Sequence, residues 1–263
     1  MRLLFEELTR EELRTMAPDA LVILPVGAVE QHGPHLPVGT DYFVVEHVAR
    51  AAAAELARDV PALVAPTMPF GSSHHHLPFG GTLSLSTATY YRVLYDLAES
   101  LILDGFRRIF MLNGHGGNHE LIQLVARDLA LKHAAHLAAA SYWTIAWDAL
   151  VEAQAHIQAG LPGHAGAFET ALVLALRPEL VREPRPHRDN PAGSDPRSFT
   201  SPYRAELHGA WQQIEGYTDS PDRATVQQGE AYLATIVGEV TRALREFDTG
   251  ARAFEAEGLG VKG

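Results

Sequence analysis

The residues best suited to chemistry in this chain lie at positions 24–41, which read LPVGAVEQHGPHLPVGTD. Glu30, His32 and Asp41 stand there among prolines and glycines that restrict the backbone. Carboxylates and imidazoles bind zinc, manganese and iron, and the chain has no cysteine that could supply a thiolate instead. In extended backbone, residues i and i+2 project to the same side, so Glu30 and His32 can approach one ion, or two adjacent ions, together. The stretch therefore predicts a metal site.

Asp41 also has a simpler explanation, because acidic side chains are favoured at helix N-termini. Beside Glu30 and His32, we interpret it as a metal ligand instead. His35 lies between two prolines of the same stretch. We expect it to support the ligands from behind or to face a substrate.

A second segment, NGHGGN at 113–118, follows an apolar run and carries His115. A glycine-rich turn between a strand and a helix could bind a phosphate through its backbone amides. The glycine spacing matches neither a P-loop nor a dinucleotide-binding turn, so a histidine here points to metal ligation. Asn118 is expected to cap the following helix, or to contact substrate.

A third segment, GHAGAFET at 163–170, carries His164 and Glu169. Glu169 falls in the second turn of an apolar helix, where a lone buried carboxylate would be costly, so we expect it to be paired or to bind metal. His164 is a candidate general acid and base. The alternative is a solvated histidine that is hydrogen-bonded to a structural glutamate.

Other polar clusters give weaker signals. The three histidines at 74–76 would, in isolation, form a surface loop, and we do not interpret them as a metal site. The serine pair at 72–73 lacks the strand-turn-helix motif of serine hydrolases. Trp143 and Trp147 are expected in the core or in a pocket wall.

The elements that must position these residues alternate between strands and helices. We expect strands at 21–26, 62–66, 107–112 and 137–143, and helices at 9–17, 40–58, 86–103, 119–135, 145–157, 167–176 and 223–247. This order predicts the α/β class, with a mostly parallel sheet covered on both faces. Sites in such sheets form beyond the carboxyl ends of the strands, where the polar segments fall. We expect one domain over 1–263, with the proline-rich segment 183–222 as a lid or interface arm.

Composition narrows the classes of function. The formal net charge of −11 disfavours binding to nucleic acids and to anionic membranes. The N-terminus becomes acidic at once and lacks the apolar core of a signal peptide, and no apolar run is long enough to span a bilayer. We therefore expect a soluble cytoplasmic protein.

Taken together, these motifs resemble those of the creatininase family of metal-dependent amidohydrolases. The matching segments are residues 25–41, HLPFGGT at 76–82, NGHGGN at 113–118 and GHAGAFET at 163–170, in the family's order. The resemblance implies a three-layer α/β/α sandwich, one or two metal ions and a ring-shaped assembly, commonly a homohexamer. It also implies metal ligands at Glu30, His32, Asp41 and His115, with Asp41 as the bridge between two ions, and a catalytic histidine at His164.

The chain departs from the family pattern at two positions. Members that hydrolyse creatinine carry an acidic ligand two residues after the histidine that matches His115, and this chain has Gly117 there. A second ion then needs another carboxylate, for which Glu169 is the candidate. The stretch that usually reads FPGT is FGGT at 79–82. Both departures argue against creatinine as the substrate and fit the broader family, which includes a deformylase of a pyrimidine intermediate and a peptide-trimming enzyme.

The resulting hypothesis is an enzyme in which two metal ions, drawn from zinc, manganese and iron, activate a water molecule that attacks an amide or cyclic amide carbonyl. His164 would move the proton to the leaving nitrogen, and Glu169 would act as a ligand and take part in catalysis. His76 and Asn118 are candidate substrate contacts, and the substrate is expected to be a small amide.

Three alternatives stay open at this point. The first is a formamide hydrolase or peptide-trimming member of the same family. The second is a dinuclear phosphoesterase, which the absence of Arg and Lys from 25–49, 59–91 and 109–126 disfavours. The third is a metal-binding assembly protein without catalysis, which the intact set of candidate ligands disfavours.

Overall fold

The computed structural model describes residues 2–155, 161–188 and 207–257. Within them, four strands form one sheet in the order β2-β1-β3-β4, and every pairing is parallel. The strands are β1 (Leu21–Val26), β2 (Ala62–Val64), β3 (Arg108–Asn113) and β4 (His136–Ser141). All four expected strands are therefore present, with shifts of one or two residues at some ends.

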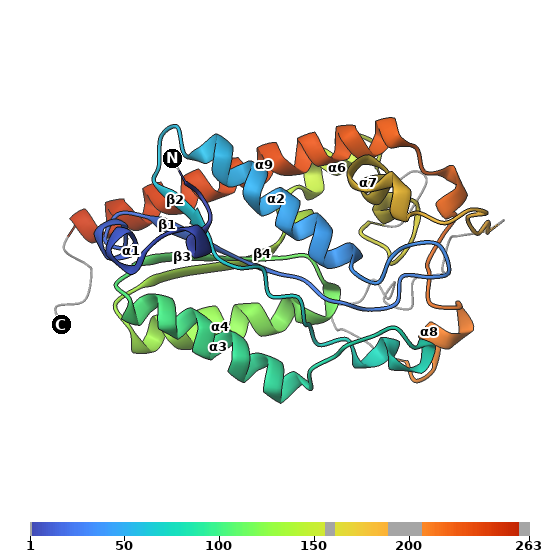
Figure 1. Ribbon diagram of the computed structural model, residues 1–263, viewed down its shortest axis with the longest axis horizontal. Helices are drawn as coiled ribbons and strands as arrows, with labels where there is room; N and C mark the ends of the chain where they lie inside the picture. The colour runs from blue at the N-terminus through green and yellow to red at the C-terminus, as the bar shows by residue number, and fades with distance from the viewer. Residues whose placement is uncertain (1, 156–160, 189–206, 258–263) are drawn as a thin grey trace.

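Helices cover both faces of this sheet. They are α1 (Arg10–Met16), α2 (Thr40–Leu56), α3 (Thr87–Leu103), α4 (His119–Lys132), α5 (Tyr142–Ile145), α6 (Trp147–Glu152), α7 (Ala167–Leu176), α8 (Ala210–Gln213) and α9 (Val226–Ala256). Short 3-10 helices occur at Phe5–Glu7, His74–Phe79, Gly116–Asn118, Pro178–Leu180 and Pro221–Arg223. Figure 1 shows α2, α7 and α9 on one side of the sheet and α3 and α4 on the other. The predicted α/β/α sandwich is confirmed.

The alternation of side chains along each strand builds two separate cores. In β1, Leu21 and Ile23 pack under α2, α7 and α9, whereas Val22 and Leu24 pack under α3 and α4. Every residue of β1 is buried, as expected for a parallel strand that is covered on both faces. This continuous apolar run is what made the strand recognisable in the sequence.

Two helix predictions need correction. The helix expected at 145–157 is shorter, because α6 begins at Trp147 and ends at Glu152, and α5 occupies Tyr142–Ile145, where the strand expected at 137–143 was to end. The last helix was expected to end at 247, but α9 continues to Ala256. It continues because Leu244, Asp248 and Ala251 keep a helical spacing on its buried side.

The strand order places a switch point between β1 and β3. The chain moves from β1 outward to β2, then crosses back to β3 and β4, so the segments that follow β1 and β3 diverge at their carboxyl ends. Such a point is where parallel sheets form ligand crevices.

The proline-rich segment is described only at 183–188 and 207–222, because residues 189–206 lie outside the described ranges. Its described part contains α8 and lies next to the loop before α7. A single domain over 1–263 stays a prediction. None of the described helices combines the length and apolar character needed for a membrane span.

Candidate metal centre

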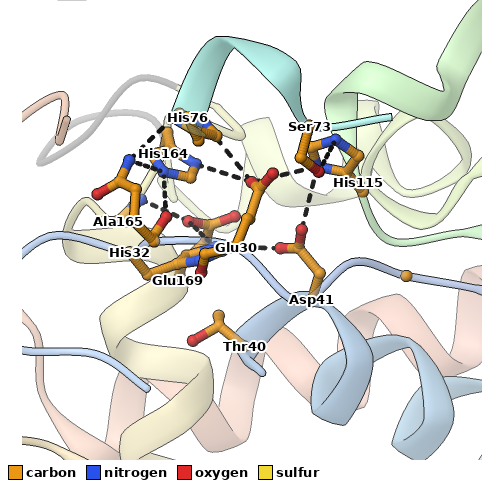
Figure 2. Close-up of polar contacts among 12 residues, drawn as sticks. Glu30, His32, Thr40, Asp41, Ser73, His76, His115, His164, Ala165 and Glu169 are labelled. Carbon is orange, nitrogen blue, oxygen red and sulfur yellow. Dashed lines mark hydrogen bonds and ion pairs between the residues drawn. The ribbon is translucent and has the colours of Figure 1, made fainter. Parts of the chain in front are cut away.

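The predicted ligands converge beyond the carboxyl ends of β1 and β3 (Figure 2). Glu30 and His32 follow β1, Asp41 lies in the first turn of α2, and His115 follows β3. His164 and Glu169 join them from the loop before α7 and from its first turn. All six side chains belong to buried residues, each exposing 7% or less of its surface: Glu30, His32, Asp41, His115, His164 and Glu169.

Asp41 lies between two histidines and divides the cluster into two groups. In the first group, His115 Nδ1 lies 3.2 Å from Glu30 Oε1 and 3.1 Å from Asp41 Oδ2. In the second, His32 Nε2 lies 3.1 Å from Asp41 Oδ1 and 3.6 Å from Glu169 Oε2. One oxygen of Asp41 therefore faces each histidine.

The other nitrogen of each ring is held by a backbone carbonyl. His32 Nδ1 lies 3.0 Å from the carbonyl oxygen of Glu30, and His115 Nε2 lies 3.2 Å from that of Ser72 and 3.1 Å from Ser73 Oγ. A carbonyl oxygen can only accept, so these nitrogens carry the ring hydrogens. In the neutral rings, the lone pairs of His32 Nε2 and His115 Nδ1 then point at the carboxylates, which is how metal-binding histidines are held.

These residues fit two neighbouring divalent cations. Donors bound at about 2.1 Å to one tetrahedral ion lie roughly 3.4 Å apart. The four nitrogen–oxygen distances in the two groups, 3.1–3.6 Å, bracket that value. In addition, Glu30 Oε2 and Asp41 Oδ2 are buried and have no hydrogen-bond partner among the described residues. Metal ions bound at the two groups would supply the missing partners of Glu30 Oε2 and Asp41 Oδ2.

The electrostatics of the cluster also favour positive charge. Burial alone would lower the pKa of His32, but the Asp41 carboxylate beside it raises that pKa to about 10. Burial raises the pKa of Glu169 to about 7, although His32 opposes the shift. The ion pairs that the described residues make with Glu30, Asp41 and Glu169 are all with histidines. Three buried carboxylates without Arg or Lys need protons or metal ions to balance them.

Gly117 has a steric reason in this structure. A Cβ at this position would lie 2.2 Å from the Ser72 carbonyl oxygen and 2.5 Å from His115 Nε2. The Ser72 carbonyl, which holds His115, thus takes the space that a side chain at 117 would need. The carboxylate of Glu169 reaches the cluster from the opposite side, next to His32.

Gly80, the other departure from the family pattern, has φ +80° and ψ 175°. Proline fixes φ near −65° and could not take this conformation. The loop therefore follows a path of its own, and Thr82 Oγ1 at its end accepts a hydrogen bond of 3.1 Å from the Gln31 backbone N–H.

Gln31 is a site residue that sequence reasoning missed. Its Nε2 lies 2.9 Å from His76 Nδ1, 3.0 Å from the Gly216 carbonyl oxygen and 3.0 Å from His164 Nε2, and its Oε1 accepts from the Gly33 N–H. The amide has only two hydrogens, which His76 Nδ1 and the Gly216 carbonyl can accept. With that assignment, His164 Nε2 donates to the backbone carbonyl oxygen of Gln31, 3.0 Å away. In the sequence, the only sign of a role for Gln31 was its position between the candidate ligands Glu30 and His32.

This arrangement turns the other nitrogen of His164 toward the cluster. His164 Nδ1 lies 3.6 Å from Glu30 Oε1. The backbone of His164 is fixed by two hydrogen bonds of 3.0 Å to Thr218, which belongs to the 183–222 segment. Ala165 then adopts a positive φ of 48° and donates from its N–H to Glu169 Oε2 at 2.6 Å. The loop thus couples the positions of His164 and Glu169.

The interpretation of 74–76 as a surface loop is wrong for two of its three histidines. His74 is exposed and bonds to Ser84 Oγ, as expected. His76 is buried, and its Nε2 lies 3.5 Å from Glu30 Oε1. His75 is half-buried and lines the cavity at the cluster.

Aromatic residues form the wall of this cavity. Trp211 of α8, which sequence reasoning also missed, lies with its ring 4.8 Å from that of His76 and 5.3 Å from that of His164. Trp143 is buried and lines the cavity, as predicted. Trp147 is 43% exposed and lies outside both the core and the cavity wall, so its prediction is wrong.

Two other predicted residues lie behind the cluster. The side chain of Asn118 makes no capping hydrogen bond to α4, so that prediction is wrong. Instead it accepts from the Ser72 N–H at 3.0 Å and donates to the Gly27 carbonyl at 3.1 Å. His35 is buried with its Nε2 2.9 Å from Thr170 Oγ1, which agrees with a supporting position rather than a substrate-facing one.

The cavity at the cluster has a volume of about 220 Å³. The described residues that line it include neither Arg nor Lys. Its lining combines Glu30, Asp41, His115, His164 and Glu169 with Ser72, His74, His75, His76, Thr87, Gly114, Gly116, Gly117, Trp143, Pro162, Gly163 and Trp211. A small polar space without cationic side chains is suited to a neutral or cationic ligand.

Comparison with known proteins gives consistent matches over most of the chain. The family model described as creatininase, creatinine amidohydrolase, matches residues 6–244. The creatinine amidohydrolase of Pseudomonas putida is 31% identical over 252 residues, covering 89% of this chain and 92% of that protein. The mycofactocin precursor peptide peptidase of Mycobacterium tuberculosis is 32% identical over 240 residues, covering 89% of this chain and 87% of that protein.

Solved structures agree with the sequence matches. A mutant creatininase in a Zn–Zn form superposes with a TM-score of 0.76 at 29% identity, covering 94% of this chain and 98% of that one. The fold comparison and the sequence comparison therefore both match this chain to creatininases.

Proposed function

This chain belongs to the creatininase family, and on that premise we propose that it hydrolyses an amide or cyclic amide C–N bond of a small neutral or cationic substrate at a centre for two divalent metal ions. One observation carries the proposal: the Asp41 carboxylate lies between His32 and His115, with one oxygen 3.1 Å from each ring. Neither ring directs a hydrogen at it in the neutral form.

The ligands divide into two sets. Glu30, Asp41 and His115 would hold one ion, and His32, Asp41 and Glu169 the other. Bound divalent cations would supply Lewis acidity and would lower the pKa of water toward about 7. The Zn–Zn form of the related creatininase supports two ions. Zinc, manganese and iron all suit nitrogen and oxygen donors, and their identity in this chain is part of the proposal.

His164 is the proposed catalytic histidine. Its Nε2 is committed to the Gln31 carbonyl, so Nδ1 is the nitrogen that can take up a proton beside Glu30 and deliver it to the leaving nitrogen of the substrate. Gln31 fixes the ring in this orientation. The part of Glu169 in the chemistry, beyond ligation, stays a prediction.

His76 is the proposed substrate contact. Burial lowers its pKa to about 3, so the ring is neutral, and its Nδ1 accepts from Gln31. Its Nε2 therefore carries the hydrogen and can donate to a carbonyl oxygen. Trp211, on the described part of the 183–222 segment, would close the same side of the pocket, which supports a pocket-shaping role for that segment.

The substrate class follows from the lining of the cavity. Phosphate esters would need cationic side chains, which the described lining lacks. A backbone carbonyl fills the space beside Gly117, which distinguishes this chain from creatinine-hydrolysing members. We therefore favour a small linear or cyclic amide, formamides included, other than creatinine. Trimming of a short peptide is the second candidate, supported by the likeness to the mycobacterial peptidase.

The experiment that tests this function combines elemental analysis with turnover. Purified protein would be assayed against creatinine, N-formyl amides, small lactams and short peptides, and its metal content measured. Asp41→Asn should lose bound metal and activity, whereas Asp96→Asn, a change of an exposed aspartate on α3, should keep both. Stoichiometric metal with no turnover across the panel would favour the non-catalytic alternative.

The remaining expectations are a cytoplasmic location and a homohexameric ring, and both stay predictions. Light scattering on the eluting protein would measure the assembly.

A further inference from the structure

We propose that His75 is an additional metal ligand, which completes the ion position formed by Glu30, Asp41 and His115. The inference rests on the proposed metal centre and adds to it a residue outside the set of ligands given above. It comes from a segment, residues 74–79, whose three leading histidines have separate environments.

The first support is proximity. A ring nitrogen of His75, a ring nitrogen of His115 and a carboxylate oxygen of Glu30 all lie within 4.8 Å of one another. The rings of His75 and His115 are nearly parallel, at 4°, with centroids 5.9 Å apart. The two imidazoles thus reach the same carboxylate side by side, from separate segments of the chain.

The second support is the local backbone. Residues His74–Phe79 form a 3-10 helix, in which successive side chains point about 120° apart. His74 accordingly points outward to Ser84 Oγ, 2.8 Å away, and His76 points inward to Gln31. His75 occupies the remaining direction, toward His115. The three consecutive histidines therefore point in three different directions and contact different partners.

The third support is the packing of the His75 ring. Its centroid lies 4.1 Å from that of His76 and 5.6 Å from that of Trp211. These contacts restrict an otherwise half-buried side chain at the mouth of the cavity. A ligand held by neighbouring rings loses less conformational freedom when it binds an ion.

The consequence is an asymmetry between the two positions. With His75, the first position gathers three donors within 4.8 Å of one another, from Glu30, His75 and His115, and Asp41, 3.1 Å from His115 Nδ1, would be the fourth. The second has three: His32, Asp41 and Glu169. Four protein donors are typical of closed zinc sites, and three leave a coordination position for water or substrate. The first ion should therefore be held more tightly, and the second should be the more accessible one.

Metal titration tests the role of His75. Demetallated full-length protein would be titrated with Co²⁺ and with Zn²⁺ against a competing chelator, with the visible absorption of Co²⁺ as the readout of coordination. His75→Asn and His75→Gln would be compared with His47→Asn, a change of an exposed histidine on α2 that does not line the cavity. Circular dichroism would confirm that each variant is folded.

We expect wild type and His47→Asn to bind equally, and both His75 variants to bind one equivalent at least about tenfold more weakly, with an altered Co²⁺ spectrum. Equal affinities and spectra in the His75 and His47 variants would overturn the inference while leaving the proposed function intact. Absence of metal binding by wild type would instead overturn the proposed function and this inference together.

Discussion

Strand β3 runs between two buried clusters of charge that are built in opposite ways. At its start, Arg108 exposes only 1% of its surface and lies 3.0 Å from Asp248 and 3.1 Å from Glu255. Its guanidinium also donates to the Pro18 carbonyl oxygen. At its other end, the carboxylates of the candidate metal centre form ion pairs only with histidines among the described residues.

The difference lies in what balances the carboxylates. Near Arg108, a permanent cation of the chain itself does so, and Arg252 adds a second cation beside Asp248. Burying a charge is tolerated when it is paired in this way. At the other end the described residues supply no permanent cation, so the balance must come from protons or from metal ions. The first cluster therefore carries its own balancing charge, and the second needs added protons or metal ions.

The largest expected effect comes from removing one carboxylate of the second cluster. Glu30→Gln should lower kcat by at least roughly 10³-fold, because both the binding of the metal ion and its activation of water depend on the negatively charged Glu30 carboxylate. Bound metal should fall with activity, and the metal-free variant should melt earlier than metal-free wild type, because, despite its burial, the histidines around Glu30 hold the pKa of its carboxyl well below the usual range and so stabilise the folded protein. Elemental analysis and calorimetry would check both. Normal metal content in this variant would contradict the assigned ligand set.

Removal of the buried cation of the first cluster should lower stability and leave metal content and kcat unchanged. Arg108→Leu would leave Arg252 as the remaining cationic partner of the buried Asp248 and should cost about 3 kcal/mol of unfolding free energy. Metal content and kcat below the melting range should stay unchanged. Urea unfolding would measure the loss, with Arg107→Leu, the exposed neighbour, as the control. Loss of metal in the folded Arg108 variant would break the distinction between the clusters.

A smaller effect should come from His35, a buried histidine that has no carboxylate partner among the described residues. Burial lowers its pKa to about 4, in contrast to His32. Below its unfolded pKa of about 6.5, the unfolded chain binds a proton that the folded chain does not bind, so stability falls as the pH decreases from about 6.5 to about 4.

For this one group, the loss between pH 7.5 and 5 should be about 2 kcal/mol. His35→Gln should therefore have a flatter dependence of unfolding free energy on pH than wild type or His74→Gln. Urea unfolding of the metal-free proteins at the two pH values would measure it. Identical slopes in all three would show that His35 is not held neutral.

The smallest expected effect concerns Gln31, which binds no ion in this account. Gln31→Leu keeps the backbone carbonyl that His164 uses, but it removes the side-chain amide, whose Nε2 lies 2.9 Å from His76 Nδ1 and 3.0 Å from His164 Nε2. At about 1–1.5 kcal/mol, this loss predicts a decrease in kcat of roughly tenfold. Metal content should stay at the wild-type value. If metal and kcat decreased in proportion, Gln31 would act through the ligands and not through the two histidines.

The fold could be predicted because its signals are local. The apolar runs of β1 and β3 read as buried strands, and Thr9 with Glu12 forms the predicted capping box of α1. The end of α9 could not be predicted, because Asp248 looks exposed in a helical pattern until Arg108, from a distant strand, pairs with it. Tertiary pairing overrode the local pattern there.

The candidate site divides in the same way. Glu30, His32, Asp41 and His115 stand out because their types and spacing suit metals, and the structure brings them together. Gln31, His75 and Trp211 gave no such signal. Their positions depend on contacts between segments far apart in the sequence, such as Gln31 with Gly216, which spacing alone does not reveal.

The most direct test of the central claim is to measure amide hydrolysis as metal is removed from the purified protein and returned in known amounts. The best substrate of the amide panel would be used, with bound metal counted in each sample. We predict that activity is lost with the metal and rises again in proportion to refilling, up to two ions per chain. Undiminished turnover by metal-free protein would contradict the account.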